Sequence, residues 1–449
     1  MPRPSARVPF GAWAAHRAWG LTLVAVTVGL ALRLLFGLGY WVGKPLTHDE
    51  REYLALGRSL AEGRGFTYTD PDGAPLPGEH FGRAPVYPLV LSAVIAGVPG
   101  PQPPRIVPDE PPVTARTLAA IKVVQALVGA LTLLLVAQLA GSVGGRPAAA
   151  VAAGLAAVYP SLVWTPAYVF SETVYSAVAL GSAVWLDREQ RSRGPGWRLA
   201  AAGILAGVAV LTRPAMLVFV ALAVPWLWWR RGALAAGAFV LGTALAIAPW
   251  TARNVAVHGR FVLVASEGGI TFWTGNHPLA IGEGDLAANP QLKRANLALR
   301  ERHPGLTPEA LEPIYYREAL SFITTEPGAW LSLMARKAFY SVVPIGPSYQ
   351  LHSPRYFWAS VVPYLAILPF SVLGFAGLFR RRRLPEALLL LGAASVVVGL
   401  VFFPQERFRI PVIDPMLIVL AACWCAGARN GGGAPRALNN AHGMPTESS

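Results

Sequence analysis

The sequence is poor in charged residues and in cysteine. Charged residues make up 14% of the 449 positions, whereas a soluble domain carries about 25%. Apolar residues reach 54% and gather in long runs, so an ordinary soluble fold is excluded. The two cysteines, Cys423 and Cys425, lie on one apolar run and would point to different faces of a helix. We therefore expect neither a disulfide nor a pair of metal ligands.

Acidic residues are scarcer than basic ones. The chain holds 24 Asp and Glu against 38 Lys and Arg, a formal net charge of +14. This excess does not indicate nucleic-acid binding, because the basic residues are mostly arginines in short clusters between apolar runs, as in membrane proteins. No cleavable signal peptide is expected, since the first apolar run, from Trp19 to Tyr40, is long enough to span and lacks a small-residue cleavage site.

The apolar runs predict an all-α polytopic membrane protein. The ten expected spans are roughly residues 18–40, 118–141, 147–166, 170–186, 198–213, 214–230, 233–250, 357–379, 385–403 and 410–427. The segment Pro85–Val98 carries a shorter apolar run, which favours an interfacial or re-entrant helix in the first outer loop.

Arginine clusters between the runs set the orientation. If the N-terminus lies in the cytoplasm and Pro85–Val98 does not span, every later cluster falls on the cytoplasmic side, as the positive-inside rule requires. These clusters are Arg146; Arg188, Arg191, Arg193 and Arg198; Arg230 and Arg231; and Arg380 to Arg383. Counting Pro85–Val98 as a span would place Arg146 and the later clusters outside, so the ten-span arrangement is preferred.

The first outer loop opens with the pattern of a helix start. Thr47 and Glu50 fit a capping box, and Asp49 is an acid of the kind that the helix dipole favours in a first turn. The residues that follow form one apolar stripe, typical of a short amphipathic helix lying on a membrane surface. The stripe consists of Tyr53, Leu56, Leu60 and Ala61. Taken alone, Asp49 and Glu50 need no catalytic role.

Four other outward-facing elements also carry ionisable groups at the membrane edge. They hold Arg83, Glu172, Arg213, and Arg407 with Arg409. Each has an ordinary explanation by itself, as a helix N-terminal acid or as a loop arginine that reaches lipid headgroups. Together they are costly to keep near a bilayer, and such groups are often functional. Acids and arginines on one face suit a phosphate-bearing substrate, with arginine binding the phosphate and an acid transferring a proton.

The second outer segment, 251–356, gives weaker signals. Glycines in Glu267-Gly268-Gly269 and near Asn276 suggest backbone close to a ligand, although ordinary turns explain them nearly as well. Two helices are expected at about 308–323 and 327–342. The histidines His277, His303 and His352 are scattered without the spacing of a metal motif.

Taken in order, these motifs resemble a known family, the membrane-embedded glycosyltransferases of the C-type fold. The likeness is to the protein O-mannosyltransferases and the lipid A aminoarabinose transferases, and it covers roughly residues 20–425. The matching pieces are Asp49-Glu50-x-x-Tyr53, Arg83-x-Pro85-x-Tyr87-Pro88, Ser171-Glu172, Leu211-Thr212-Arg213-Pro214, Pro249-Trp250-x-x-Arg253-Asn254, Gly275-Asn276-x-Pro278 and Arg407-x-Arg409-x-Pro411.

The resemblance implies an activity. A sugar would pass, with inversion, from a polyprenyl phosphate to a hydroxyl of an unknown glycan, lipid or protein on the extracytoplasmic face of the inner membrane. Asp49 matches the catalytic acid that serves as general base, Glu172 a second outer-loop acid, and Arg83 a basic residue near the lipid phosphate. Gly82 stands where relatives place a Glu used in a metal site, so neither a metal nor another cofactor is expected.

Substrate contacts are assigned on the same grounds. The candidates are Glu50, Tyr53, Arg83, Tyr87, Arg213, Arg253, Asn276, Arg407 and Arg409. The chain then divides into a transmembrane catalytic module, 1–250, with the first outer loop at 41–117; an extracytoplasmic region, 251–356; C-terminal transmembrane helices, 357–427; and a cytoplasmic disordered tail, 428–449.

Two alternatives from other classes stay open. A flippase for lipid-linked sugars would need ionisable groups near the middle of the spans, and the spans here are nearly free of them. A non-catalytic scaffold of an envelope-assembly complex is compatible with the composition, but the presence of Asp49 and the arginine set argues against it.

Overall fold

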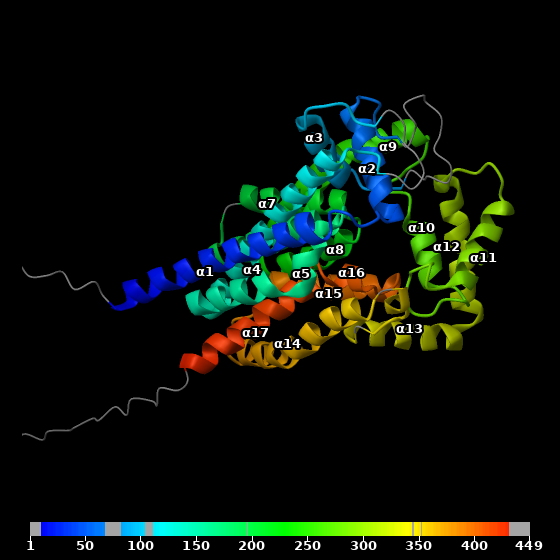
Figure 1. The fold of residues 1–449 in the computed structure, drawn as a ribbon. Coiled ribbons are helices and arrows are strands. Elements are labelled where there is room, and N and C mark those ends of the chain that lie inside the picture. The colour runs from blue at the N-terminus through cyan, green and yellow to red at the C-terminus, as the bar shows by residue number, and fades with distance from the viewer. Residues whose placement is uncertain are drawn as a thin grey trace, which may run out of the picture.

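The computed structural model describes residues 10–67, 82–103, 111–194, 196–343, 345–351 and 353–430. Within these ranges the regular elements are all helices (Figure 1), as expected. The predicted cytoplasmic tail lies outside the described residues from 431 onward. Its first positions continue the last helix, α17 (Ile413–Asn430).

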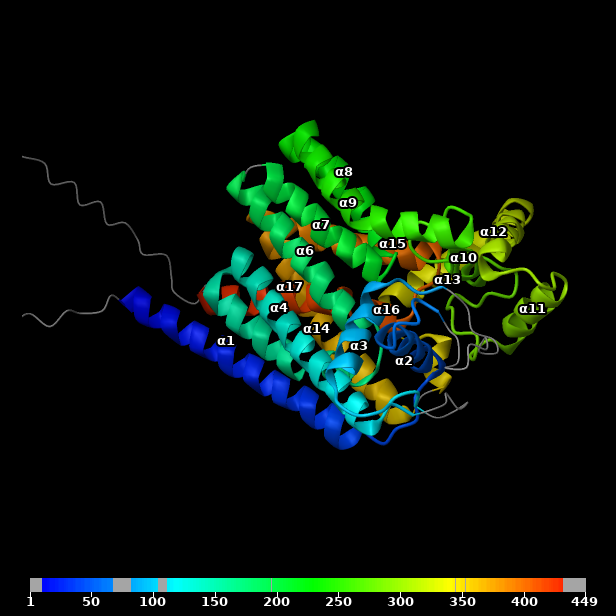
Figure 2. The ribbon, with the colours of Figure 1, turned by 90° about the horizontal axis from the view of Figure 1, so that it is seen from above.

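The long helices pack side by side in a bundle. Helix α1 (Phe10–Leu34) continues as a π-helix, Leu35–Tyr40, and lies against α4 at the edge of the bundle (Figure 2). The other bundle helices are α4 (Ala115–Val158), α5 (Pro160–Trp164), α6 (Glu172–Ser192), α7 (Gly196–Thr212), α8 (Met216–Arg231), α9 (Ala233–His258), α14 (Pro354–Arg380), α15 (Glu386–Val401) and α17. Helix α17 packs on both α4 and α14, so the last part of the chain closes onto the first.

Within the described residues, four helices are long and apolar enough to cross a membrane. They cover Ala18–Tyr40, Ala115–Val158, Ala233–Val257 and Pro354–Arg380. Shorter apolar helices follow at Gly196–Thr212, Glu386–Val401 and Ile413–Gly427, among others. Each region predicted to span is helical, and the number of ten spans stays a prediction.

Helix α4 contains the predicted span 118–141 and the first part of the span 147–166, which ends in α5 and a 3₁₀ turn, and a kink separates the two. Gly145 has φ 78° and ψ 180°, which a residue with a side chain rarely adopts. Pro147 follows two positions later, and its missing N–H suits the first turn of a new helical segment. The short turn predicted between the two spans is therefore present at Gly145, and the two helical segments that it joins lie side by side, since Leu133 and Ala157 both lie next to Gly29 of α1.

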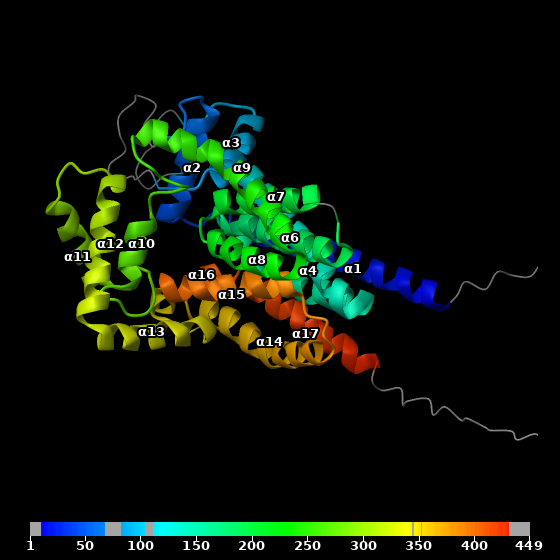
Figure 3. The same ribbon diagram turned by 180° about the vertical axis from the view of Figure 1, so that it is seen from behind.

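The polar loops gather at the end of the bundle away from the described termini (Figures 1 and 3). The first loop forms α2 (His48–Ala61) and α3 (Val86–Gly97), which pack against each other. The predicted capping box is confirmed: Thr47 N–H donates to Glu50 Oε2 at 2.8 Å, and Glu50 N–H donates to Thr47 Oγ1 at 3.4 Å. Helix α3 lies where the sequence predicted an interfacial or re-entrant helix.

The apolar stripe that predicted α2 on a membrane surface is largely covered by protein, and the place of the helix relative to a membrane stays a prediction. Most of the helix, including Glu50, Glu52 and all residues from Tyr53 to Ser59, is buried by the rest of the protein. Gly57 contributes to this packing, because a Cβ atom there would lie 2.7 Å from Leu91 Cβ of α3. The polar face that suggested an exposed helix instead faces other polar side chains.

The second outer segment forms α10 (Gly268–Gly275), α11 (Pro290–Glu301), α12 (Pro308–Thr325) and α13 (Pro327–Val342). The last two confirm the helices predicted at about 308–323 and 327–342. Helices α10 to α12 share a small apolar core of their own, made of Trp273, Leu292, Leu299, Leu311, Tyr315 and Ala319. A 3₁₀ turn, Pro347–Leu351, leads back to the bundle, and the one-turn helix α16 (Glu406–Arg409) precedes α17.

Candidate active site

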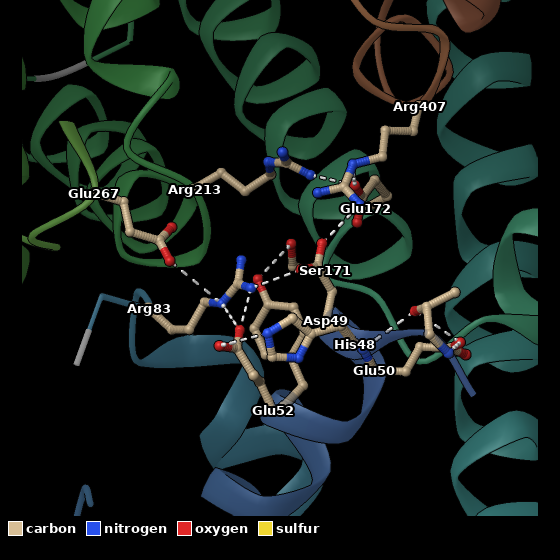
Figure 4. A network of polar contacts seen from close by, with 12 residues as sticks. His48, Asp49, Glu50, Glu52, Arg83, Ser171, Glu172, Arg213, Glu267 and Arg407 are labelled. Atoms are coloured by element: carbon tan, nitrogen blue, oxygen red, sulfur yellow. Dashed lines mark hydrogen bonds and ion pairs between the residues drawn. The ribbon is translucent and has the colours of Figure 1, made fainter. Parts of the chain in front are cut away.

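Acids and arginines from several distant parts of the chain meet at the polar end of the bundle. We call them the acid–arginine cluster (Figure 4). Its members are Asp49, Glu52, Arg83, Glu172, Arg213, Glu267 and Arg407. They come from α2, the segment before α3, the start of α6, the α7–α8 turn, the α9–α10 loop and α16. Residues that are 358 positions apart, Asp49 and Arg407, are in direct contact.

Asp49 lies at the centre of the cluster, in the first turn of α2. Its Oδ1 accepts a hydrogen bond from Arg83 Nη2 at 2.9 Å, and its Oδ2 accepts one from Arg407 Nη1 at 2.8 Å. Burial by itself raises the pKa of a carboxyl, but here the guanidiniums of Arg407 and Arg83 outweigh that effect and hold the pKa of Asp49 well below its usual range. Asp49 is therefore ionised at neutral pH and binds both arginines.

Arg83 is surrounded by three acids. Besides Asp49, it donates from Nε to Glu52 Oε2 at 3.1 Å, and the same Nε lies 3.6 Å from Glu267 Oε1. The Arg83 guanidinium also lies over the Tyr53 ring, 4.8 Å from its centroid, so the two groups make a cation–π contact. Tyr53 in turn donates to Ser171 Oγ at 3.3 Å, at the start of α6.

Glu172 organises the other two arginines. Its Oε1 lies 2.6 Å from Arg213 Nη1 and 3.5 Å from Arg407 Nε. The two guanidiniums also share the ring of Phe408, at 4.8 Å and 5.3 Å from its centroid. Because the Glu172 side chain is only 3% exposed, its charge is balanced inside the protein by these arginines. The cluster thus presents three arginines, all held in place by carboxylates.

Two residues that were predicted to contact the substrate bind other residues of the protein instead. Glu50 caps α2 with one carboxylate oxygen, and its Oε1 accepts from Val169 N–H at 2.9 Å. Tyr87 is fully buried and donates to Gln125 Oε1 at 2.8 Å. The Tyr87 ring packs edge-on against Tyr53, with centroids 4.8 Å apart. Both residues are bound to other parts of the protein, and neither is a member of the acid–arginine cluster.

Three more predicted contacts lie outside the cluster. Arg253 stacks on Trp250, 4.8 Å from its ring centroid. Asn276 donates to two backbone carbonyls and accepts from Lys337 Nζ at 3.1 Å, so it ties α10 to α13. Arg409 lies 2.9 Å from Asp414 Oδ1, and its guanidinium lies over Tyr364, away from Arg407. Of the two arginines predicted in this segment, Arg407 belongs to the acid–arginine cluster and Arg409 is paired with Asp414.

Two cluster members, Glu52 and Glu267, were not among the predicted site residues. Glu52 lies three positions after Asp49, a spacing that puts both acids on one face of a helix and could have identified it. Glu267 had only the weak signal of the glycines that follow it. Among the described residues, no group of three or more His, Cys, Asp and Glu side chains is arranged to hold a metal ion.

No family model and no characterised protein matches the sequence at a significant level. Solved structures do match the fold. The oligosaccharyltransferase of Archaeoglobus fulgidus, tethered to an acceptor peptide with the NVT sequon, matches with a TM-score of 0.56 at 17% identity, over 97% of this chain and 52% of its own. AglB from Archaeoglobus fulgidus, in complex with an inhibitory peptide and a dolichol-phosphate, matches with a TM-score of 0.55 at 15% identity, over 96% and 52%.

ArnT from Cupriavidus metallidurans, bound to undecaprenyl phosphate, also matches, at 14% identity over 92% of this chain and 79% of its own, with a TM-score of only 0.38. At such identities a likeness establishes the fold alone. The two oligosaccharyltransferase matches show the fold that the motifs suggested, that of the C-type membrane glycosyltransferases. The chain spans about half the length of these oligosaccharyltransferase chains, 52% in each of the two cases.

Proposed function

We propose that this chain transfers a sugar from a polyprenyl-phosphate-linked donor to an acceptor hydroxyl on the extracytoplasmic face of the inner membrane. The observation that carries the proposal is the contact of one carboxylate, Asp49, with two arginines from distant parts of the chain, Arg83 and Arg407. The structural neighbour AglB is an oligosaccharyltransferase described in complex with a dolichol-phosphate, which supports a lipid phosphate as the donor group.

The arginines suit a phosphate that gains negative charge during the reaction. As the bond between the sugar C1 and the phosphate oxygen breaks, the electron pair goes to the phosphate, and Arg83, Arg213 and Arg407 can stabilise it by charge-assisted hydrogen bonds. Binding that is equal in the ground state and the transition state would not accelerate transfer. The contacts must strengthen as the lipid phosphate leaves, and guanidiniums that are already held by Glu172 and Glu52 meet that need with little reorganisation.

Asp49 is the proposed general base. The acceptor oxygen forms the new bond to C1 on the face opposite the phosphate, and its proton passes to the Asp49 carboxylate. In the structure described here the two arginines depress the basicity of Asp49. A donor phosphate that binds Arg83 and Arg407 competes with Asp49 for them, frees its oxygens and raises its pKa. Donor binding would thus switch on the base.

The alternatives can be separated from this proposal by direct measurement. A flippase would move a lipid-linked sugar across a bilayer without consuming it, and a scaffold would do neither. The test is to incubate the purified chain in detergent or nanodiscs with isoprenyl-phosphate sugars and candidate acceptors, and to measure release of the free isoprenyl phosphate. Comparison of envelope lipids, glycans and proteins from cells with and without the chain, by mass spectrometry, would identify the sugar and acceptor from the missing mass. If no donor is consumed, the transferase proposal fails.

A further inference from the structure

Glu267 enters the acid–arginine cluster through a space that Gly82 leaves open. A Cβ atom at position 82 would lie 2.7 Å from Glu267 Oε1 and 2.8 Å from its Cδ, and closer still to its Cγ, distances that real Cβ atoms do not tolerate. The Glu267 side chain therefore occupies the volume that any residue other than glycine would need. Figure 4 shows it reaching toward Arg83 from the opposite side to Asp49.

The neighbour of Gly82 in the chain is the residue that Glu267 contacts. Arg83 Nε lies 3.6 Å from Glu267 Oε1 and 3.1 Å from Glu52 Oε2, whereas Arg83 Nη2 donates to both Asp49 and Glu52. The two glutamates thus hold the Nε edge of the guanidinium. Arg83 Nη1 has no hydrogen-bond acceptor in the described part of the chain, and it is the nitrogen left to meet a ligand.

We propose that Glu267 is a positioning residue, which reaches through the space above Gly82 and holds Arg83 ready for the phosphate of the donor. The inference rests on the proposed function and adds the part played by the second outer segment. When a phosphate displaces Asp49 from Arg83, Glu52 and Glu267 still fix the Nε edge, so the guanidinium does not follow Asp49 away from the ligand. Because Glu52 belongs to α2 and Glu267 to the α9–α10 loop, their shared contact with Arg83 also joins the two outer segments.

Two single substitutions test this by different routes. Glu267→Gln removes the charge and keeps the shape. Gly82→Ala leaves every charged group intact, yet its methyl group would push the Glu267 side chain out of its place. Alanine adds only the Cβ atom that would meet Glu267, so it tests this contact with the smallest change of side chain. Each variant should bind the probe farnesyl phosphate roughly tenfold more weakly than the wild type does. This factor is at the lower end of the range of affinity lost when a charge-assisted contact is removed.

The double variant decides whether the two act through one contact. Residues that share an interaction give non-additive effects, whereas independent sites add. We expect Gly82→Ala with Glu267→Gln to bind the probe no more weakly than the worse single variant. The matched control is Glu62→Gln, which changes another acid of the first outer segment that pairs with Arg58 at 2.6 Å, outside the cluster. Thermal unfolding in detergent verifies that each variant is folded.

The outcomes separate this inference from the proposed function. In transfer assays Glu267→Gln should raise KM for the donor while kcat changes little. Wild-type binding in Glu267→Gln, a fall in kcat without a change in KM, or additive losses in the double variant would each overturn the positioning role while leaving the transferase proposal intact. If the wild-type chain itself binds no farnesyl phosphate, the proposed function fails and the inference falls with it.

Discussion

Replacing Asp49 by asparagine tests the assignment of the general base. Asparagine keeps the size of the side chain and one acceptor oxygen, but it cannot take up a proton. In the structure Asp49 accepts from Arg83 at 2.9 Å and from Arg407 at 2.8 Å. The amide of the introduced asparagine would accept from one of them and turn its N–H groups toward the other. Both arginines would then be freer to bind phosphate than they are in the wild type.

The expected result follows from these contacts. A positioned general base typically contributes about 10²–10⁴-fold to the rate, so Asp49→Asn should lower kcat by roughly that factor. Donor binding should be unchanged or tighter, because the carboxylate that competes with the phosphate is gone. The assay pairs sugar transfer with farnesyl phosphate binding on the same detergent-solubilised samples. A wild-type rate in Asp49→Asn would refute the assignment and make Glu172 the candidate base.

The neighbouring residue provides the control. Glu50→Gln removes an acid from the same helical turn, but Glu50 is bound to Thr47 and Val169 and takes no part in the cluster. Glutamine has one acceptor oxygen in place of two, so this variant should lose some stability, about 1 kcal/mol for a weakened cap. The folded protein should keep most of its transfer activity. Equal losses of activity in the two variants would point to a disturbed helix start.

Further predictions concern other residues. Arg407→Lys keeps the charge but loses the planar guanidinium, so donor binding should weaken roughly tenfold while the unfolding temperature stays normal. Arg409→Met should lower the free energy of unfolding by about 3–5 kcal/mol, because it leaves the Asp414 carboxylate without its arginine in the interior. Burial lowers the pKa of Lys337 to about 7 from 10.5, so the unfolded chain binds more protons between these values and stability should rise with pH across that window. Lys337→Met should flatten this slope in unfolding measurements at about pH 7 and about pH 9, the window that this shift opens. For the topology, a single cysteine at Arg213 should react with an impermeant thiol reagent in intact cells; protection there, with labelling at Arg146, would contradict the ten-span arrangement.

The helical elements could be predicted because their causes are local. Long apolar runs specify helices wherever they occur, and the Thr47–Glu50 capping box acts over one turn, so its prediction is confirmed by the hydrogen bonds. The order of the motifs along the chain was enough to indicate the C-type fold. Local pattern does not show what covers α2. The apolar stripe of α2 suggested a helix on a membrane surface, and periodicity does not reveal whether protein or solvent covers the polar face.

Composition and order along the chain indicated a helical membrane protein with acids and arginines at one end, and the resemblance of its motifs to a known family indicated the C-type fold. Only the tertiary structure decided which of them meet. Arg407 and Arg409 are two positions apart, yet the turn of α16 directs one to Asp49 and the other to Asp414, because residues two apart do not share a helix face. Glu267 reaches the site because Gly82, nearly two hundred residues earlier, has no side chain. The sequence does not show that these two residues are neighbours, because only folding brings them together.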